Sequence, residues 1–211
     1  MRWNLSPRRL LAGYVVGIFP MADDDGKVHW LAPDPRAIIN LDAFRVTRSL
    51  RTLVRRGLFE IRINSSFAEV VAACADRPDG TWISPQIRDA YTELHRLGFA
   101  HSVEAWKDGA LDGGLYGVAI GGAFFGESMF HRATGASKVA MAHLVERMRQ
   151  RGMTLLDVQF MTEHLRSFGA VEIARSDYER RLRDAVRRPC AFVDGAGSLT
   201  LGESLPEYLA P

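Results

Sequence analysis

Three polar side chains stand inside apolar stretches of this chain, and their chemistry suits the binding or deprotonation of an amine. Asp157 and Gln159 alternate with apolar residues, and Glu127 follows Gly126 in a second apolar stretch. The two-residue period of a strand places Asp157 and Gln159 on one face. A buried carboxylate without partners costs several kcal/mol or takes up a proton. Each acid is therefore either paired inside the fold or exposed to a ligand.

Each of these residues also has a purely structural interpretation. Asp157 and Gln159 fit a hydrogen-bonded strand end, and Glu127 fits an ion pair with one of the many arginines. Considered together, the three residues predict a site that binds and positions a cationic amine. This hypothesis is more specific than any that one of them supports alone.

A group of arginines is a second candidate for function. Within residues 45–56 the chain carries Arg48, Arg51, Arg55 and Arg56. Spacings of three and four bring guanidinium groups onto one helical face, where they can follow a phosphate backbone. The alternative is a solvated surface helix. Because no acidic residue interrupts the stretch, the pattern favours nucleic-acid binding.

The sequence contains no motif for several other kinds of chemistry. Cys74 and Cys190 are far apart, and the six histidines show no metal-binding pair. The glycines at residues 113–122 lack the order of a phosphate loop and indicate hairpin turns. No apolar stretch approaches the roughly 18 residues of a membrane span, and residues 1–9 lack the apolar core of a secretory signal. We therefore expect a cytoplasmic protein that binds neither membrane nor metal.

The composition is that of a folded globular protein. The 211 residues are 47% hydrophobic and 25% charged, which excludes a disordered or fibrous chain. The net charge of +2 is too small to indicate nucleic-acid binding, so local clusters of charge must decide that question.

Helix caps and residue periodicity predict the elements that position these side chains. The N-terminal half alternates helices and strands, with a proline-rich and aromatic irregular segment at residues 18–36 that is a candidate pocket wall. The predicted elements there are a helix from residue 6, a strand at 37–41, a helix at 45–56 closed by Gly57, a strand at 58–64, and helices at 66–75 and 85–97.

The centre of the chain predicts an antiparallel meander, because strand-like stretches are joined by Asp-Gly and Gly-Gly turns. Its strands are residues 101–106, 111–120 and 124–130; there follow a helix capped by Ser137 and ended by Gly152, a strand at 153–160, a helix at 163–168, a strand at 171–174 and a helix at 176–187. This order predicts a mixed sheet with helices on its faces, an α+β arrangement of the acetyltransferase kind.

Short motifs spread along the chain are the most specific signal. They are Gly17-Ile18-Phe19-Pro20-Met21, Pro33-Asp34-Pro35-Arg36, Thr81-Trp82-Ile83, His101-Ser102-Val103-Glu104-Ala105-Trp106, Gly113-Gly114-Leu115-Tyr116-Gly117, Gly126-Glu127-Ser128-Met129-Phe130, Ala136-Ser137-Lys138 and Asp157-Val158-Gln159. In order and spacing, from about residue 5 to residue 180, the chain resembles the bacterial leucyl/phenylalanyl-tRNA-protein transferases.

This resemblance implies a GNAT-like catalytic domain over residues 61–211 and a small N-terminal α/β subdomain over residues 1–60, shorter than in many relatives. It implies transfer of leucine or phenylalanine, and also methionine, from aminoacyl-tRNA to proteins with N-terminal Arg or Lys. That reaction feeds the bacterial N-degron degradation pathway. It implies neither metal nor coenzyme A, because the aminoacyl ester is already activated.

The resemblance also assigns roles to residues by position. Asp157 and Gln159 correspond to the catalytic pair, and Glu127 to an acceptor-site or catalytic acid. The apolar pocket for the transferred side chain falls on Met21, Trp82, Leu115, Phe124 and Leu144. The tRNA-contacting helix carries Arg48, Arg51, Arg55 and Arg56.

The predicted reaction is attack of a neutral amine on the aminoacyl ester. We expect the Gln159 amide oxygen to accept a hydrogen bond from the amine, while Asp157 orients Gln159 or the amine. A non-catalytic RNA-binding module is the first alternative, although it has no use for the three polar residues. A coenzyme-A-dependent N-acetyltransferase is the second, although the sequence has no pyrophosphate loop.

Overall fold

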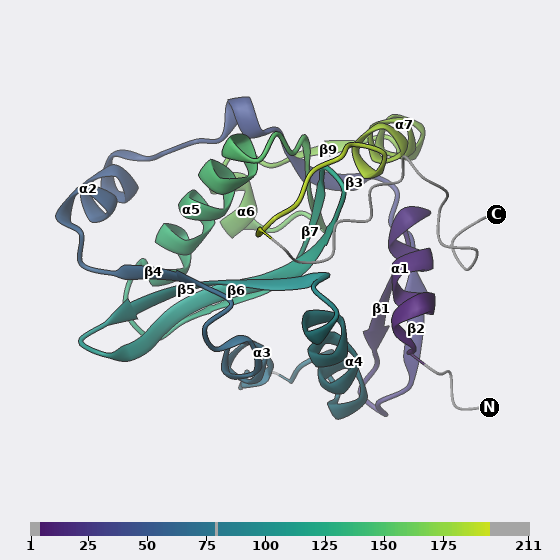
Figure 1. The fold of residues 1–211 in the computed structure, drawn as a ribbon, viewed down its shortest axis with the longest axis horizontal. Coiled ribbons are helices and arrows are strands. Elements are labelled where there is room, and N and C mark those ends of the chain that lie inside the picture. Colours follow the sequence, from purple (N-terminus) through teal and green to yellow (C-terminus); the bar gives the residue numbers. More distant parts are fainter. Residues whose placement is uncertain (1–4, 79, 195–211) are drawn as a thin grey trace.

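A seven-stranded mixed sheet with helices on both faces forms the centre of the molecule (Figure 1). The computed structural model describes residues 5–78 and 80–194. The strands lie in the order β4-β5-β6-β7-β8-β3-β9. Strands β7 and β8 are parallel, and the other neighbouring pairs are antiparallel. The predicted mixed α+β sheet is confirmed.

The strands agree with the predicted positions within a few residues. They are β3 (Arg36–Ile39), β4 (Glu60–Ile63), β5 (Ala100–Lys107), β6 (Ala110–Ile120), β7 (Ala123–His131), β8 (Leu155–Gln159) and β9 (Val171–Ile173). Strands β5, β6 and β7 form the predicted antiparallel meander. Helix α5 then crosses over and brings the chain into β8, parallel to β7, as a parallel pair requires.

Helices cover the two faces of the sheet with separate apolar cores. One core is closed by α1 (Pro7–Val15), α3 (Phe67–Ala75), α4 (Pro85–Arg96) and α7 (Arg175–Val186). The other is closed by α2 (Arg48–Arg56), α5 (Ala136–Gln150) and α6 (Glu163–Ser167). No helix among the described residues is long and apolar enough to cross a membrane.

The ends of two helices show how local chemistry sets their position. Helix α2 begins after Thr47, whose hydroxyl accepts a hydrogen bond from the Leu50 amide at 3.2 Å, and it ends at the left-handed Gly57. The prediction that Ser137 caps α5 is wrong. Gly135, at a φ of +85°, is the capping residue, and Ser137 lies buried in the first turn.

Part of the glycine prediction is also wrong. Gly113 and Gly117 lie inside β6 rather than in a turn. A Cβ on Gly117 would approach the Phe125 carbonyl oxygen to 2.2 Å, and one on Gly113 would approach the Ala136 Cβ to 2.5 Å. These glycines therefore let β7 and α5 approach closely. Gly121 does lie in the β6–β7 turn, with a φ of +53°.

The segment predicted to be irregular is a two-stranded antiparallel hairpin. It consists of β1 (Phe19–Ala22) and β2 (Val28–Leu31). Its turn is closed by Asp23, whose carboxylate accepts hydrogen bonds from the Lys27 amide and from His29, each at 2.8 Å. In Figure 1 the hairpin and α1 lie side by side at one end of the sheet.

Strand β3 connects the N-terminal part of the chain to the C-terminal part. It pairs with β8 on one side and with β9 on the other. Residues 36–39 are therefore in the same sheet as the strands from β4 onward. The division at residue 60 into a subdomain and a catalytic domain stays a prediction.

Candidate functional site

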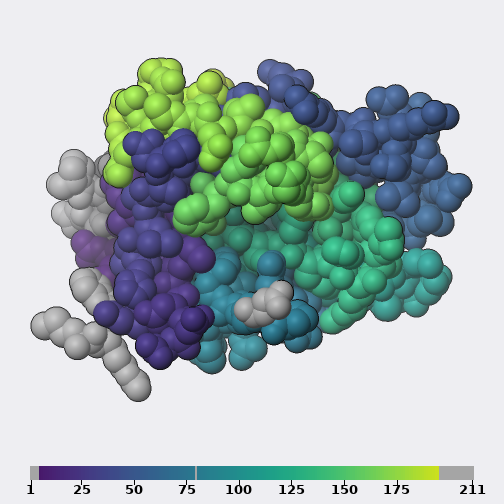
Figure 2. Space-filling model, turned by 180° about the vertical axis from the view of Figure 1, so that it is seen from behind, coloured from purple at the N-terminus to yellow at the C-terminus, as the bar shows by residue number. Residues whose placement is uncertain are grey.

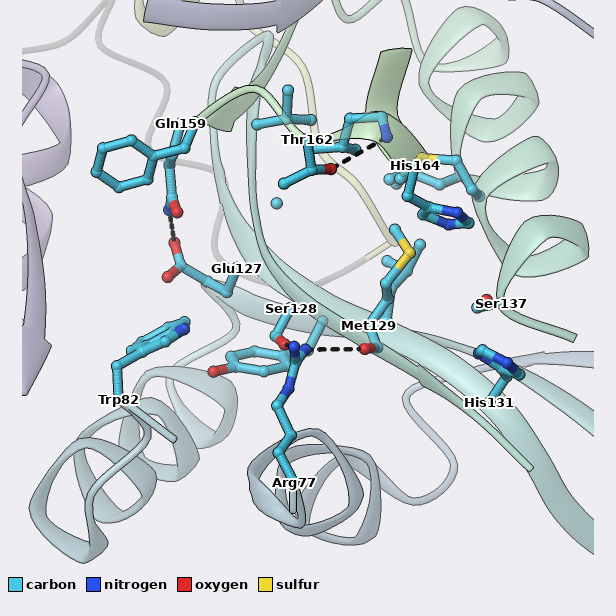
Figure 3. A pocket seen from close by; sticks show the side chains of 18 of the residues that line it. Arg77, Trp82, Glu127, Ser128, Met129, His131, Ser137, Gln159, Thr162 and His164 are labelled. Carbon is cyan, nitrogen blue, oxygen red and sulfur yellow. Dashed lines mark hydrogen bonds between the residues drawn. The ribbon is translucent and has the colours of Figure 1, made fainter. Parts of the chain in front are cut away.

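A pocket of about 480 Å³ opens where the ends of β7 and β8 meet α5, α6 and the hairpin. Figure 2 shows the side on which the hairpin (purple), α6 (green) and the segment before α4 come together. The lining residues, most of which appear as sticks in Figure 3, are Met21, Arg77, Trp82, Leu115, Tyr116, Gly126, Glu127, Ser128, Met129, His131, Ser137, Met141, Leu144, Val158, Gln159, Phe160, Thr162, His164 and Leu165.

Most of the predicted apolar pocket residues line this cavity. They are Met21, Trp82, Leu115 and Leu144. Phe124 does not line it, because its side chain is fully buried in the core cluster that also contains Leu115 and Leu144. The prediction that residues 18–36 supply a pocket wall is confirmed by Met21 of β1.

Glu127 lies on β7 at the edge of the pocket, held by three neutral donors. Its Oε1 accepts hydrogen bonds from the Tyr14 hydroxyl at 2.7 Å and from Gln159 Nε2 at 3.0 Å. Its Oε2 lies 3.1 Å from the Tyr91 hydroxyl, which also contacts the Tyr14 hydroxyl. Because each phenol carries one proton, the two phenols can supply the protons for only two of these three contacts when Glu127 is ionised, and a protonated Glu127 supplies the third. Among the described residues Glu127 forms no ion pair, so its structural interpretation as an arginine partner is wrong.

Burial raises the pKa of Glu127 to about 7. The hydrogen bonds from Tyr14, Gln159 and Tyr91 act in the opposite direction, because they favour the charged form, and the charge of Asp157 again raises the pKa. The neutral donors do not offset the cost of burying the charge. Glu127 therefore exchanges its proton in the range where an α-amine also does.

Asp157 lies on β8 and is completely buried in a different environment. Its two oxygens accept hydrogen bonds from Arg36 Nε at 2.9 Å and Arg36 Nη2 at 2.7 Å, and Oδ2 also accepts one from the Tyr178 hydroxyl at 2.6 Å. The Arg36 guanidinium lies over the rings of Phe19 and Tyr178. Asp157 does not line the pocket, and its interpretation as a hydrogen-bonded strand residue is confirmed.

Gln159 connects the two carboxylates. Its backbone amide donates to Asp157 Oδ1 at 2.9 Å, and its side-chain amide donates to Glu127, which it faces in Figure 3. Its φ is +64°, a left-handed conformation that costs a non-glycine residue about 1–3 kcal/mol. Its amide oxygen has no hydrogen-bond partner among the described residues. Asp157 thus fixes the backbone that aims this amide at Glu127 and the pocket.

Apart from Gln159, the partners of the two carboxylates are not predicted by the sequence. Arg36 is the first residue of the apolar strand β3, and a buried arginine needs an acid, but that signal does not say which acid. Tyr91 falls on the apolar stripe of α4, where a phenol needs a partner. Nothing in the sequence indicates a role for Tyr14. Arg77 was also missed; it donates to Ser128 Oγ at 2.9 Å and to the Met129 carbonyl at 3.2 Å (Figure 3).

The arginines of α2 lie on the surface, as the amphipathic pattern predicts. All four of Arg48, Arg51, Arg55 and Arg56 are exposed, and none forms an ion pair with a described residue. Leu50 anchors the helix in the core shared with α5. Contact with tRNA stays a prediction.

Comparisons with known proteins agree with one another. The family model described as leucyl/phenylalanyl-tRNA protein transferase matches residues 38–183, and the model for the N-terminal domain of that transferase matches residues 4–34. A leucyl/phenylalanyl-tRNA–protein transferase from Gloeobacter violaceus is 52% identical over 190 residues, which cover 90% of this chain and 98% of that protein. One from Salinibacter ruber is 54% identical over 180 residues, which cover 85% of this chain and 79% of that protein.

A solved structure, that of L-PGS from Bacillus licheniformis, shares 14% identity and a TM-score of 0.42, over 71% of this chain and 51% of that one. That likeness is too slight to bear on the fold or the reaction. The sequence matches define the class of protein, which is an aminoacyltransferase. More narrowly, the chain belongs to the leucyl/phenylalanyl-tRNA protein transferase family.

Proposed function

We propose that this protein transfers leucine or phenylalanine from aminoacyl-tRNA to the α-amino group of proteins with N-terminal Arg or Lys. The observation that carries the proposal is the Glu127–Gln159 pair at an apolar pocket in a member of this family. Methionine is also a substrate, since an apolar pocket distinguishes side chains by size, and one methylene is worth only about 1–3 kcal/mol.

Positioning of the amine next to the ester accounts for much of the rate enhancement over the uncatalysed reaction. The free amide oxygen of Gln159 accepts a hydrogen bond from the attacking amine, and Asp157 acts through the Gln159 backbone instead of touching the amine. The left-handed backbone at Gln159 supports this assignment, because strain of that kind is held in place by the surrounding hydrogen bonds. Well-aligned reactants gain roughly 7–11 kcal/mol over free encounter.

Glu127 accepts the proton. As the amine nitrogen forms its bond to the ester carbon, the amine proton passes to the Glu127 carboxylate. The bond between the carbonyl carbon and the ribose oxygen then breaks, and the proton goes to that oxygen. A pKa of about 7 supports both steps, since the group releases the proton as readily as it takes it up. The site needs no cofactor because the ester supplies the activation.

Glu127 also favours acceptor proteins with N-terminal Arg or Lys. It is the acidic residue among the lining residues, and it gives one end of the pocket a negative charge when ionised. A protein that begins with Arg or Lys brings positive charge to that end. The apolar part of the pocket, with Leu115 and Leu144, then takes the side chain of the transferred amino acid.

The helix α2 binds the tRNA. Its exposed arginines carry no acidic partner among the described residues, which supports contact with phosphates. Each phosphate contact contributes about one unit to the slope of log affinity against log salt. The double variant Arg48→Ala with Arg51→Ala should reduce that slope by about two. An unchanged slope would make α2 a solvated face.

The finer fold class and the cellular role follow from the same assignment. The parallel β7–β8 pair after an antiparallel meander supports a GNAT-like catalytic domain. Transfer onto N-terminal Arg or Lys would mark acceptor proteins for the bacterial N-degron pathway in the cytoplasm.

A direct test uses labelled leucine on tRNA and two peptides that differ only in an N-terminal Arg or Ala. Label should appear on the Arg peptide alone. Label on both peptides would remove the acceptor rule but keep the transferase. Label on neither, with tRNA bound and the protein folded, would leave an RNA-binding protein.

A further inference from the structure

The Ser137 hydroxyl lines the pocket and forms no hydrogen bond with a described residue. The residue as a whole is 2% exposed, but its oxygen is not among the fully buried atoms without a partner, so it is open to water or a ligand in the pocket. A ligand that accepts a hydrogen bond can take the place of that water. Figure 3 shows Ser137 beside His131, at the end of the pocket away from Glu127 and Gln159.

The backbone next to Ser137 offers further donors. Ser137 lies in the first turn of α5, a helix of 15 residues, and the capping residue is Gly135, which has no side chain to satisfy the first amides. The amides of Ser137 and Lys138 find no backbone acceptor in the part of the chain that the structure describes. Free amides at the start of a long helix, together with its dipole, favour a negatively charged ligand.

The side chains in the first turn of α5 are positive or neutral. The first turn of α5 contains no acidic residue, and Lys138 forms no ion pair with a described residue. Burial lowers the pKa of His164, and the charges of Lys138 and His131 act in the same direction. Both histidines line the pocket that Ser137 lines. Glu127 is four residues from His131 along β7, or about 13 Å. An anion bound here would face Lys138 at a distance from the Glu127 charge.

The same helix end is continuous with the arginines of α2. Leu53 of α2 lies against Gly135, where an added Cβ would approach Leu53 Cδ1 to 2.5 Å. In Figure 1, α2 lies beside α5. A nucleic-acid strand that leaves the α2 arginines therefore reaches the start of α5 first and the Glu127 end of the pocket last.

We propose that the start of α5, with the Ser137 hydroxyl, binds the phosphate that precedes the terminal nucleoside of the donor tRNA. This inference rests on the proposed function. The phosphate accepts hydrogen bonds from the Ser137 hydroxyl and from the free amides of Ser137 and Lys138, while Lys138 neutralises its charge. The terminal nucleoside and its ester then lie between this site and Gln159. The phosphate thus sets how far the ester enters the pocket.

The test compares two minimal donors, 3′-leucyl-adenosine and the same molecule with a 5′-phosphate, in transfer to the Arg peptide. The wild-type protein should favour the phosphorylated donor by about tenfold or more in kcat/KM, as expected for hydrogen bonds to a charged group. Ser137→Ala should lose most of that preference through KM, with little change for leucyl-adenosine. Lys138→Gln should reduce the preference in the same way.

Ser176→Ala is the matched control. Ser176 is the second residue of α7, as Ser137 is of α5, but it is exposed and does not line the pocket. This variant should keep the wild-type preference. Equal use of both donors by the wild-type protein would overturn the inference, and so would an unchanged preference in both Ser137→Ala and Lys138→Gln. Absence of transfer from either donor and from charged tRNA would instead overturn the proposed function, and the inference with it.

Discussion

Glu127 and Asp157 are buried carboxylates on adjacent parallel strands, yet their surroundings differ in kind. Asp157 is matched by the Arg36 guanidinium, which faces both of its oxygens, and it is sealed from the pocket. Glu127 is held by two phenols and an amide, and it lines the pocket. Burial raises the pKa of Glu127 to about 7, and its neutral donors do not offset that effect. This difference supports the proposal that Glu127 transfers the proton and that Asp157 acts by positioning.

Removing the proton acceptor should have the largest effect. Glu127→Gln keeps the size of the side chain and most of its hydrogen-bonding capacity, so the fold and the tRNA affinity should be retained. Loss of a general base typically costs about 10²–10⁴-fold in rate. Single-turnover transfer at saturating charged tRNA measures this loss. Turnover near the wild-type value would mean that the amine proton leaves by another route.

Breaking the sealed pair should cost stability. Asp157→Ala leaves the Arg36 charge buried without its partner, and such a loss typically costs about 3–5 kcal/mol. Urea unfolding measures the change. The double variant Arg36→Met with Asp157→Ala removes both charges and should recover part of the loss. A stable single variant with normal turnover would remove Asp157 from its positioning role.

The pH dependence of stability distinguishes the two acids. The raised pKa of Glu127 means that the folded protein holds a proton that the unfolded chain has lost, between about pH 4.5 and about pH 7. This contribution to stability is complete below pH 4.5 and is lost as the pH rises through 7, on the order of 3 kcal/mol in total. Relative to Glu127→Gln, the wild-type protein should therefore weaken across this range in urea unfolding. A constant difference between the two proteins would show that Glu127 does not titrate there.

The smallest effects come from single phenol donors. The Tyr14 hydrogen bond favours ionised Glu127, so Tyr14→Phe should move the rise of the pH–rate profile to higher pH. The loss of one hydrogen bond lowers turnover at pH 6 by less than about tenfold. Tyr178→Phe is the matched control, because it removes a donor from Asp157 instead. Equal shifts of the pH–rate profile in both variants would contradict the proposal that the two acids have different roles.

The elements were more predictable than the contacts between them. The ends of α2 depend on residues next to them in the sequence, namely the Thr47 cap and Gly57, so the sequence predicts where this helix lies. The hairpin β1–β2 was missed because its short strands contain Pro20 and show no clear alternation. The start of α5 was misplaced because a left-handed glycine took the capping position that a serine usually holds.

The candidate site depends on contacts between distant parts of the chain. Tyr14 is 113 residues from Glu127, and Arg36 is 121 residues from Asp157. No periodicity or spacing connects residues so far apart, which is why the sequence indicates the two acids and Gln159 but not Tyr14 or Arg36 as their partners. The resemblance to a family named Met21, Trp82, Leu115 and Leu144 of the apolar lining, while Met129, Met141, Ser137 and Arg77 are identified as lining residues only by the packed structure.

Strand β3 has a further consequence, for the order in which the protein is made. A ribosome releases β3 early, but both of its neighbours in the sheet, β8 and β9, emerge more than a hundred residues later. Arg36 accordingly has no ion-pair partner until Asp157 has been synthesised. The strands of the sheet can all pair only when nearly the whole described chain has been synthesised. Pairing over such long separations slows folding. A nascent chain therefore cannot assemble the Asp157–Gln159 network until Tyr178, which donates to Asp157, has left the ribosome.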